Sequence, residues 1–276
     1  MLKIPKNDYP RPQFVRNNWT NLNGKWDFEY DYGKSGLFRG ITTPEYKYNH
    51  EILVPFCPES ELSMIGNKDF MNCIWYRRTF NISEDQMKNR VILHFGAVDY
   101  HATVYINGME VCEHFGGYSS FSADITKCLH AGENYIYVCA EDEIRSGDQP
   151  RGKQTSIYCS CGCDYTRTTG IWQTVWLEEV PDTYLKAVKI LTDYTNEKIQ
   201  FTANIAGTTD NLSGFEILTE ISFEGKRVSE KRVDISNIST NYEVTVENPV
   251  LWDVGKPNLY DITYKLIKDG EELDIV

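Results

Sequence analysis

The feature that most constrains the fold is the alternation of apolar and polar residues with a period of two. Val91, Leu93 and Phe95 mark one face of a strand, and the segments 135–139 and 174–177 are rich in β-branched and aromatic residues. No segment keeps a helical period for more than about 12 residues. We therefore expect an all-β chain.

Residues 102–111 carry the sharpest local signal. Asn107-Gly108 separates the run ATVYI from MEV. Because Asn-Gly accepts the positive φ values of a type I′ turn, this stretch predicts a β-hairpin. Helical signals are few: Ser83 with Gln86 forms a capping-box pattern for a turn or two, and Thr126 opens another short turn.

The 276 residues suffice for two domains at about 150 residues each, and the character of the chain changes near Pro181-Asp182. Residues 1–182 are rich in Trp, Gly and Cys, with long irregular loops, which favours a jelly-roll β-sandwich. Residues 183–276 carry shorter strands with tight turns, which favours an immunoglobulin-like β-sandwich.

The charge balance limits the partners. A net charge of -12 would repel phosphate backbones and anionic lipid, so we do not expect nucleic acid as a partner. Neither do we expect a membrane, because no apolar run approaches the roughly 20 residues that cross a bilayer. The first residues, MLKIPKNDYPRPQ, show no export signal, which favours a cytoplasmic protein, although a chain whose signal had been removed would look the same.

Three of the eight cysteines, Cys159, Cys161 and Cys163, alternate immediately before Asp164. On an extended strand the outer two would lie ~13 Å apart, whereas the sulfurs of one zinc site lie less than ~4 Å apart. A metal site would therefore need a sharp turn at Gly162. We favour free thiols that pack on a strand face as small apolar groups, and we expect no metal and no cofactor.

Eight stretches stand out for their order along the chain. They are YPRPQFVRNNWTNLNGKWDF (9–28), ILVPFCPES (52–60), WYRRTF (75–80), LHFGAVDYHATVYINGMEV (93–111), GGYSSFSADIT (116–126), QPRGKQ (149–154), TGIWQTVWLEEV (169–180) and LWDVGKPNLYDI (251–262). Together they resemble the N-terminal part of glycoside hydrolase family 2, which includes β-galactosidases, β-glucuronidases and β-mannosidases.

The resemblance implies a galactose-binding-like jelly roll, an immunoglobulin-like sandwich and then a (β/α)8 barrel that carries both catalytic glutamates. A retaining glycosidase needs two carboxylates ~5 to 5.5 Å apart, and no spacing among the 40 acidic residues identifies such a pair. By resemblance the pair lies beyond Val276. We therefore expect no catalytic residue here, and a chain that does not hydrolyse glycosides by itself.

The resemblance also implies a role for Asp164, which stands where β-galactosidases and β-glucuronidases have an aspartate that contacts the sugar. The alternative is an Asp that makes an Asx turn. Arg151 and Lys153 are further candidates for binding a sugar or its carboxylate, or they form a solvated basic loop. Tyr165 and Trp172 could stack on a sugar, although aromatic residues in a sandwich are more often buried.

The expected function is that of the non-catalytic N-terminal part of a retaining β-glycosidase acting on terminal β-linked sugars, most similar to a β-galactosidase. Alternatives are a β-glucuronidase of the same family and a stand-alone, lectin-like carbohydrate-binding module. A structural assembly module is a third alternative, because members of the family often form homo-oligomers through these domains.

Overall fold

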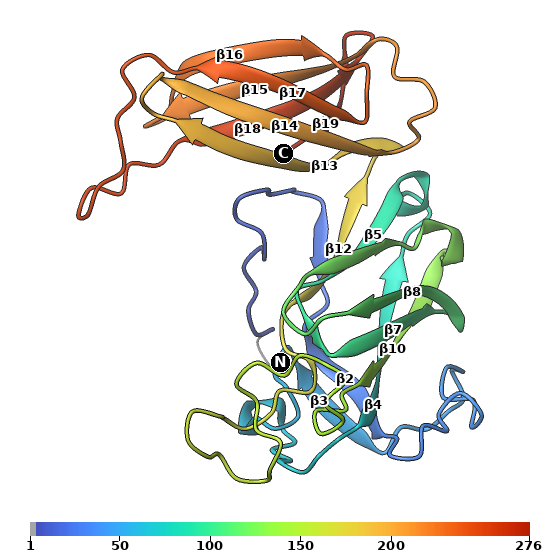
Figure 1. Ribbon diagram of the computed structural model, residues 1–276. Coiled ribbons are helices and arrows are strands. Elements are labelled where there is room, and N and C mark those ends of the chain that lie inside the picture. Colours follow the sequence, from blue (N-terminus) through green and yellow to red (C-terminus); the bar gives the residue numbers. More distant parts are fainter. Residues whose placement is uncertain (1–3) are drawn as a thin grey trace. The chain divides into compact units, whose positions relative to one another are not determined.

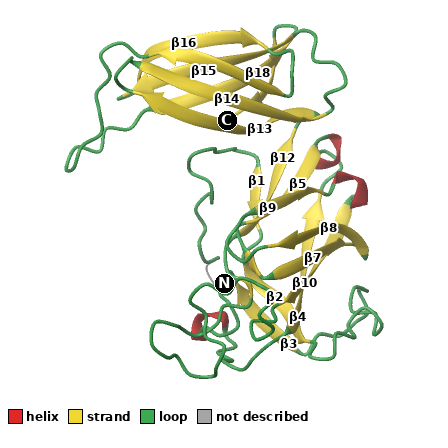
Figure 2. Ribbon diagram, viewed as in Figure 1, coloured by secondary structure: helices red, strands yellow, loops and turns green. Residues whose placement is uncertain are grey.

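The computed structural model describes residues 4–276, nearly all of them in β-strands and loops (Figure 1, Figure 2). The helices in this range are three short 3-10 turns, at Glu61–Ser63 (η1), Gln86–Lys88 (η2) and Thr126–Cys128 (η3). None of the helices within residues 4–276 is long and apolar enough to cross a membrane. The predicted all-β class is confirmed.

The chain forms two compact units. The first contains residues 4–10 and 18–179, and the second contains Arg11–Asn17 together with Val180–Val276. A short early segment therefore belongs to the later unit, where Phe14 joins the apolar core. The sequence-based division between residues 182 and 183 stays a prediction.

The first unit contains a six-stranded sheet in the order β3-β2-β4-β10-β7-β8, a four-stranded sheet in the order β1-β12-β5-β9, and a two-stranded sheet of β11 and β6 (Figure 1). The strands are β1 (Trp19–Asn21), β2 (Gly24–Tyr30), β3 (His50–Val54), β4 (Cys73–Ile82), β5 (Arg90–Phe95), β6 (Val98–Asp99), β7 (His101–Ile106), β8 (Met109–Phe115), β9 (Phe121–Asp124), β10 (Gly132–Glu141), β11 (Gly170–Ile171) and β12 (Val175–Val180).

The first four residues of strand β4 are buried on both faces of the sheet. Its residues Ile74 and Tyr76 belong to the main core, to which strands of both large sheets contribute. Its residues Cys73 and Trp75 face a smaller apolar cluster on the other side, together with Ile41 from the segment between β2 and β3. A second covering layer explains why the first four residues of β4, CIWY, form a continuous apolar run instead of an alternating one.

Two local predictions for the first unit are confirmed. The turn between β7 and β8 has φ values of 51° at Asn107 and 82° at Gly108, as a type I′ hairpin requires. At η2 the Ser83 N–H donates to Gln86 Oε1 over 2.9 Å, and the Gln86 N–H donates to Ser83 Oγ over 3.2 Å. This reciprocal pair is the capping box that the sequence predicts.

The second unit is a seven-stranded sandwich, in agreement with the immunoglobulin-like prediction. One sheet has the order β13-β14-β17 and the other the order β16-β15-β18-β19. The strands are β13 (Thr183–Asp193), β14 (Lys198–Gly207), β15 (Phe215–Phe223), β16 (Lys226–Asp234), β17 (Ser239–Thr245), β18 (Asp261–Lys268) and β19 (Glu271–Ile275). Positive φ values at Glu224-Gly225 and Asp269-Gly270 close the two tight turns expected after β15 and β18.

Candidate functional site: the loop between β10 and β11

Residues 142–169 form the long connection between β10 and β11, here called the β10–β11 loop, and they include Asp164, Arg151 and Lys153. Asp164 ends a tight reversal of the chain. The Cys161 N–H donates to the Asp164 carbonyl over 3.2 Å, and the Asp164 N–H donates to the Cys161 carbonyl over 3.0 Å. Gly162 allows the reversal because its φ is 59°, in the left-handed region that glycine tolerates.

This turn corrects the prediction made for the three alternating cysteines. They do not lie on an extended, packed strand: Cys159, Cys161 and Cys163 are exposed. The sharp bend at Gly162 overrides the alternating pattern, because reversing the chain removes the common strand face. The prediction of free thiols is confirmed for all eight cysteines.

Asp164 and Arg151 lie together, as the sequence analysis proposed for one site. Arg151 Nη1 is 2.9 Å from Asp164 Oδ2, with the two side chains 38% and 29% exposed. The same guanidinium donates to the Gln154 carbonyl, which fixes its position. Within residues 4–276, no donor reaches Asp164 Oδ1. A partly exposed carboxylate with one open acceptor atom is suited to binding hydroxyl groups.

Lys153 is exposed and stays apart from this pair. Its main-chain carbonyl accepts a hydrogen bond from the Tyr165 N–H over 2.7 Å, so the backbone is fixed while the side chain extends into solvent. No acidic group in the described part of the chain lies within ion-pair distance of the ammonium group. Lys153 therefore offers a positive charge that is available to an anion.

Gln154 connects the β10–β11 loop to strand β6 of the first unit. Its Nε2 donates to Asp99 Oδ2 over 2.7 Å, and its Oε1 accepts from the Thr168 N–H over 2.6 Å. Gln154 and Asp99 are both buried. This role of Gln154 was not predicted, since in the sequence the residue stands only as the last letter of QPRGKQ. Its place in a long loop, just after Arg151 and Lys153, was the only sign in the sequence that Gln154 has a structural role.

Three buried carboxyl groups lie at the base of the loop. Asp99 bonds to Gln154, Asp142 accepts from Gln149 Nε2 and Thr169 Oγ1, and Glu59 accepts from the Thr169 N–H. They are 1%, 5% and 4% exposed, so they hold the loop and do not face a substrate. Burial is the main cause that raises the pKa of Asp99 to about 7 and that of Glu59 to about 7, and it also raises the pKa of Asp142.

Aromatic residues form the neighbouring wall. Tyr118 and Trp172 meet edge to face with ring centroids 5.7 Å apart, and Trp172 Nε1 donates to the Gly117 carbonyl over 2.7 Å. The Tyr118 side chain is 65% exposed, and that of Trp172 is half-buried. An exposed tyrosine ring beside Gly152 of the loop presents a face suited to the C–H surface of a sugar. Tyr118 belongs to the stretch GGYSSFSADIT, and no role was predicted for it.

Two glycines of the recognised motifs are needed for close approach. A Cβ atom on Gly117 would lie 2.1 Å from Asp99 Oδ1, and one on Gly170 would lie 2.2 Å from Tyr76 Oη. Gly170 also has a φ of 73°. These contacts explain in physical terms why the motifs GGY and TGIW carry glycine at Gly117 and Gly170, where the backbone passes close to the side chains of Asp99 and Tyr76.

Two family models match the chain. The model for "Glycosyl hydrolases family 2, sugar binding domain" matches residues 19–181, and the model for "Glycosyl hydrolases family 2" matches residues 183–276. Among curated relatives, a β-galactosidase of Thermoanaerobacter pseudethanolicus is 34% identical over 75% of this chain. A putative β-glucuronidase of Formosa agariphila is 28% identical over 73% of it.

The chain spans only part of these relatives, 28% of the first and 24% of the second. Among solved structures, the apo β-glucuronidase of Ruminococcus gnavus superposes with a TM-score of 0.77 at 20% sequence identity. That match covers 98% of this chain and 46% of the enzyme. The match supports the fold described above.

Proposed function

The chain belongs to glycosyl hydrolases family 2, and on this premise we propose that it is the non-catalytic, sugar-facing part of a retaining β-glycosidase. The complete enzyme would hydrolyse terminal β-linked sugars, in the manner of a β-galactosidase. Support comes from the relatives, which include enzymes named β-galactosidase and β-glucuronidase and which the chain matches over a minor share of their length.

The observation that carries the proposal is the pairing of Asp164 with Arg151. The guanidinium holds one carboxylate oxygen at 2.9 Å, while Oδ1 accepts no hydrogen bond within residues 4–276. In the proposed role Oδ1 accepts hydrogen bonds from sugar hydroxyls, and Tyr118 and Lys153 line the approach. Charge-assisted bonds of this kind are stronger than those between neutral groups.

The chemistry is assigned to another part of the enzyme, because retention requires two carboxylates ~5 to 5.5 Å apart beside the scissile bond. Two acids of the β10–β11 loop serve other purposes: Asp164 is paired with Arg151, and Asp142 is buried. The 276-residue chain is therefore expected to bind sugars weakly and to leave nitrophenyl β-glycosides intact.

Calorimetric titration with galactose, glucuronate and short oligosaccharides tests this proposal, together with a turnover assay on nitrophenyl β-glycosides. Weak binding without turnover supports a part of an enzyme. Tight binding by the chain alone would instead support a lectin-like module. Turnover that is abolished by mutation of residues in this chain would contradict the proposal.

A β-glucuronidase is the second candidate, and one observation favours it. Lys153 presents an exposed ammonium group, unpaired within residues 4–276, on the same loop as Asp164. A uronic acid differs from galactose in carrying a carboxylate, which an ammonium group recognises by charge. Comparing glucuronides with galactosides in the complete enzyme distinguishes the two candidates.

A further inference from the structure

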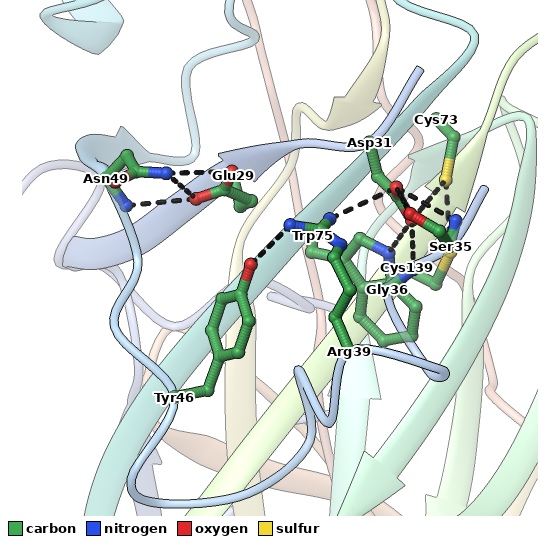
Figure 3. Close-up of polar contacts among 10 residues, drawn as sticks. All are labelled: Glu29, Asp31, Ser35, Gly36, Arg39, Tyr46, Asn49, Cys73, Trp75 and Cys139. Carbon is green, nitrogen blue, oxygen red and sulfur yellow. Dashed lines mark hydrogen bonds and ion pairs between the residues drawn. The ribbon is translucent and has the colours of Figure 1, made fainter. Parts of the chain in front are cut away.

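Two buried thiols face each other on adjacent strands of the six-stranded sheet, away from the β10–β11 loop. Cys73 begins β4 and Cys139 lies on β10, and their sulfur atoms are 3.6 Å apart. The residues are 1% and 6% exposed. Figure 3 shows the pair next to the carboxylate of Asp31.

Glu141 completes a group of three potential ligands. It lies two residues after Cys139 on β10 and pairs with Cys73 across the ladder, so all three side chains share one face of the sheet. One ligand atom from each residue lies within 4.8 Å of the others. Two sulfurs bound to one tetrahedral zinc at ~2.3 Å would be about 3.8 Å apart, close to the observed separation.

A bound divalent cation would offset most of the negative charge around the group. Asp31 Oδ2 lies 4.0 Å from Cys73 Sγ, Arg39 lies 3.1 Å from the other oxygen of Asp31, and Lys34 lies 2.6 Å from Glu141. Two thiolates and two carboxylates give four negative charges. A divalent cation with the lysine and the arginine gives four positive charges, and Glu143, 3.9 Å from Lys34, adds one further negative charge at the exposed edge, so a bound cation offsets most of the negative charge of the site.

The surroundings hold Asp31 in a fixed orientation. Its Oδ2 accepts from the Gly36 N–H over 2.7 Å and from Trp75 Nε1 over 3.1 Å (Figure 3). At the other end of the segment between β2 and β3, Glu29 accepts from the side chain of Asn49. Asp31 is thus a fixed carboxylate beside a ligand, the outer-shell arrangement that supports metal sites.

We propose that Cys73, Cys139 and Glu141 form a site for a borderline-soft divalent cation of the Zn²⁺ class. Binding replaces the two thiol protons with two metal–sulfur bonds, and both protons pass to solvent. Glu141 keeps one oxygen on Lys34 and binds the metal with the other. The Glu141 side chain is 34% exposed, so the metal enters at this rim and water occupies the fourth position.

A cobalt(II) titration of the reduced chain without oxygen tests the proposal, because cobalt thiolates give a charge-transfer absorbance. The background is the triple variant Cys159→Ser, Cys161→Ser, Cys163→Ser, which removes the exposed thiols. We expect one cobalt per chain, displaced by Zn²⁺, and no charge-transfer band after a further Cys139→Ser substitution.

Two variants at the rim keep the test independent of folding. Glu141→Gln should weaken the affinity for cobalt about tenfold or more, the scale of losing an outer-shell partner or a ligand. Glu143→Gln is the matched control, because it also lies near Lys34, at 3.9 Å, and is not a ligand. It should leave the affinity unchanged.

Three results would overturn the proposal. The first is no thiolate band in the background variant, which would leave the pair as core thiols. The second is equal affinity in Glu141→Gln and Glu143→Gln. The third is a reduced chain that binds no cobalt but loses two hydrogens by mass after treatment with an oxidised dithiol. That result would make Cys73 and Cys139 a disulfide-forming pair.

Discussion

Arg16 and Asp274 form a buried ion pair across 258 positions of the sequence. Arg16 Nη2 lies 2.6 Å from Asp274 Oδ2, with the side chains 4% and 6% exposed. Both residues also bind the backbone of Leu185: its N–H donates to Asp274 over 2.8 Å, and its carbonyl accepts from Arg16 over 2.6 Å. These bonds fix the early segment Arg11–Asn17 within the second sandwich.

Arg16→Ala should therefore lower the free energy of unfolding of the second unit by ~3–5 kcal/mol, because Asp274 would remain as an uncompensated buried charge. Hydrogen exchange of the β14 amides measures this unit specifically. Arg227→Ala, which removes ion pairs of a half-exposed side chain, serves as the control and should cost less than ~1 kcal/mol. Equal losses in the two variants would contradict the prediction.

The sequence predicted the elements that local chemistry determines. Asn107-Gly108 and Asp269-Gly270 lie at tight turns because their residue types tolerate positive φ, whatever their surroundings. The pairing of Arg16 with Asp274 could not be predicted, because no sequence pattern around either residue indicates which side chain it contacts. Such long-range pairs follow from the packing of the whole sandwich.

The free energy of unfolding of the first unit should depend on pH because of the buried Asp99. Burial, with the nearby charges of Asp142 and Glu59, raises the pKa of Asp99 to about 7, so the folded chain holds a proton that the unfolded chain releases near pH 4. Stability must therefore fall as pH rises from about 4 to 7, by ~1.4 kcal/mol for each unit of pKa difference.

Asp99→Asn removes this contribution and keeps the shape of the side chain. The variant should match the parent near pH 3, where Asp99 is protonated in both the folded and the unfolded chain, and exceed it near pH 8. Urea denaturation at both pH values measures the difference. A variant that is less stable than the parent at pH 8 would show that Asp99 is needed in its charged form.

Asp124→Asn provides the control of opposite sign. Burial alone would raise the pKa of Asp124, but hydrogen bonds from Thr126 and Arg90 outweigh it and lower the pKa. Its contribution is present above the unfolded carboxyl pKa and is lost as pH falls. Asp124→Asn should therefore weaken the first unit near neutral pH and approach the parent in acid.

Asp164→Ala in the complete enzyme should reduce kcat/KM by roughly tenfold to a thousandfold, the scale of one to three lost charge-assisted hydrogen bonds. Steady-state kinetics on a nitrophenyl β-glycoside measure the change. Asp148→Ala, at an exposed position of the same loop, is the matched control and should leave kcat/KM unchanged. An unaltered value for Asp164→Ala would remove this residue from the site.

The candidate site shows where prediction from the sequence stops. Asp164 was proposed because the resemblance places an aspartate at a fixed distance before Gly170, whose close contact with Tyr76 gives the motif a physical basis. Gln154 was missed because its function depends on Asp99, a residue from another strand. The turn at Gly162 was weighed as a requirement for metal, but an alternating pattern carries no information on where a strand reverses.

Lys153 gives the last and most discriminating prediction, because it separates the two candidate substrates. Its ammonium group is exposed on the β10–β11 loop, and within residues 4–276 no acid neutralises it. If the complete enzyme acts on glucuronides, Lys153→Ala should lower kcat/KM for a nitrophenyl β-glucuronide by about tenfold, equivalent to ~1.4 kcal/mol. The value for the corresponding galactoside should not change, since galactose has no charge for Lys153 to attract.

Added salt should reduce glucuronide turnover by the parent more than by the variant, because screening weakens an exposed charge interaction. Equal losses on both substrates would show that Lys153 supports the loop without recognising a carboxylate.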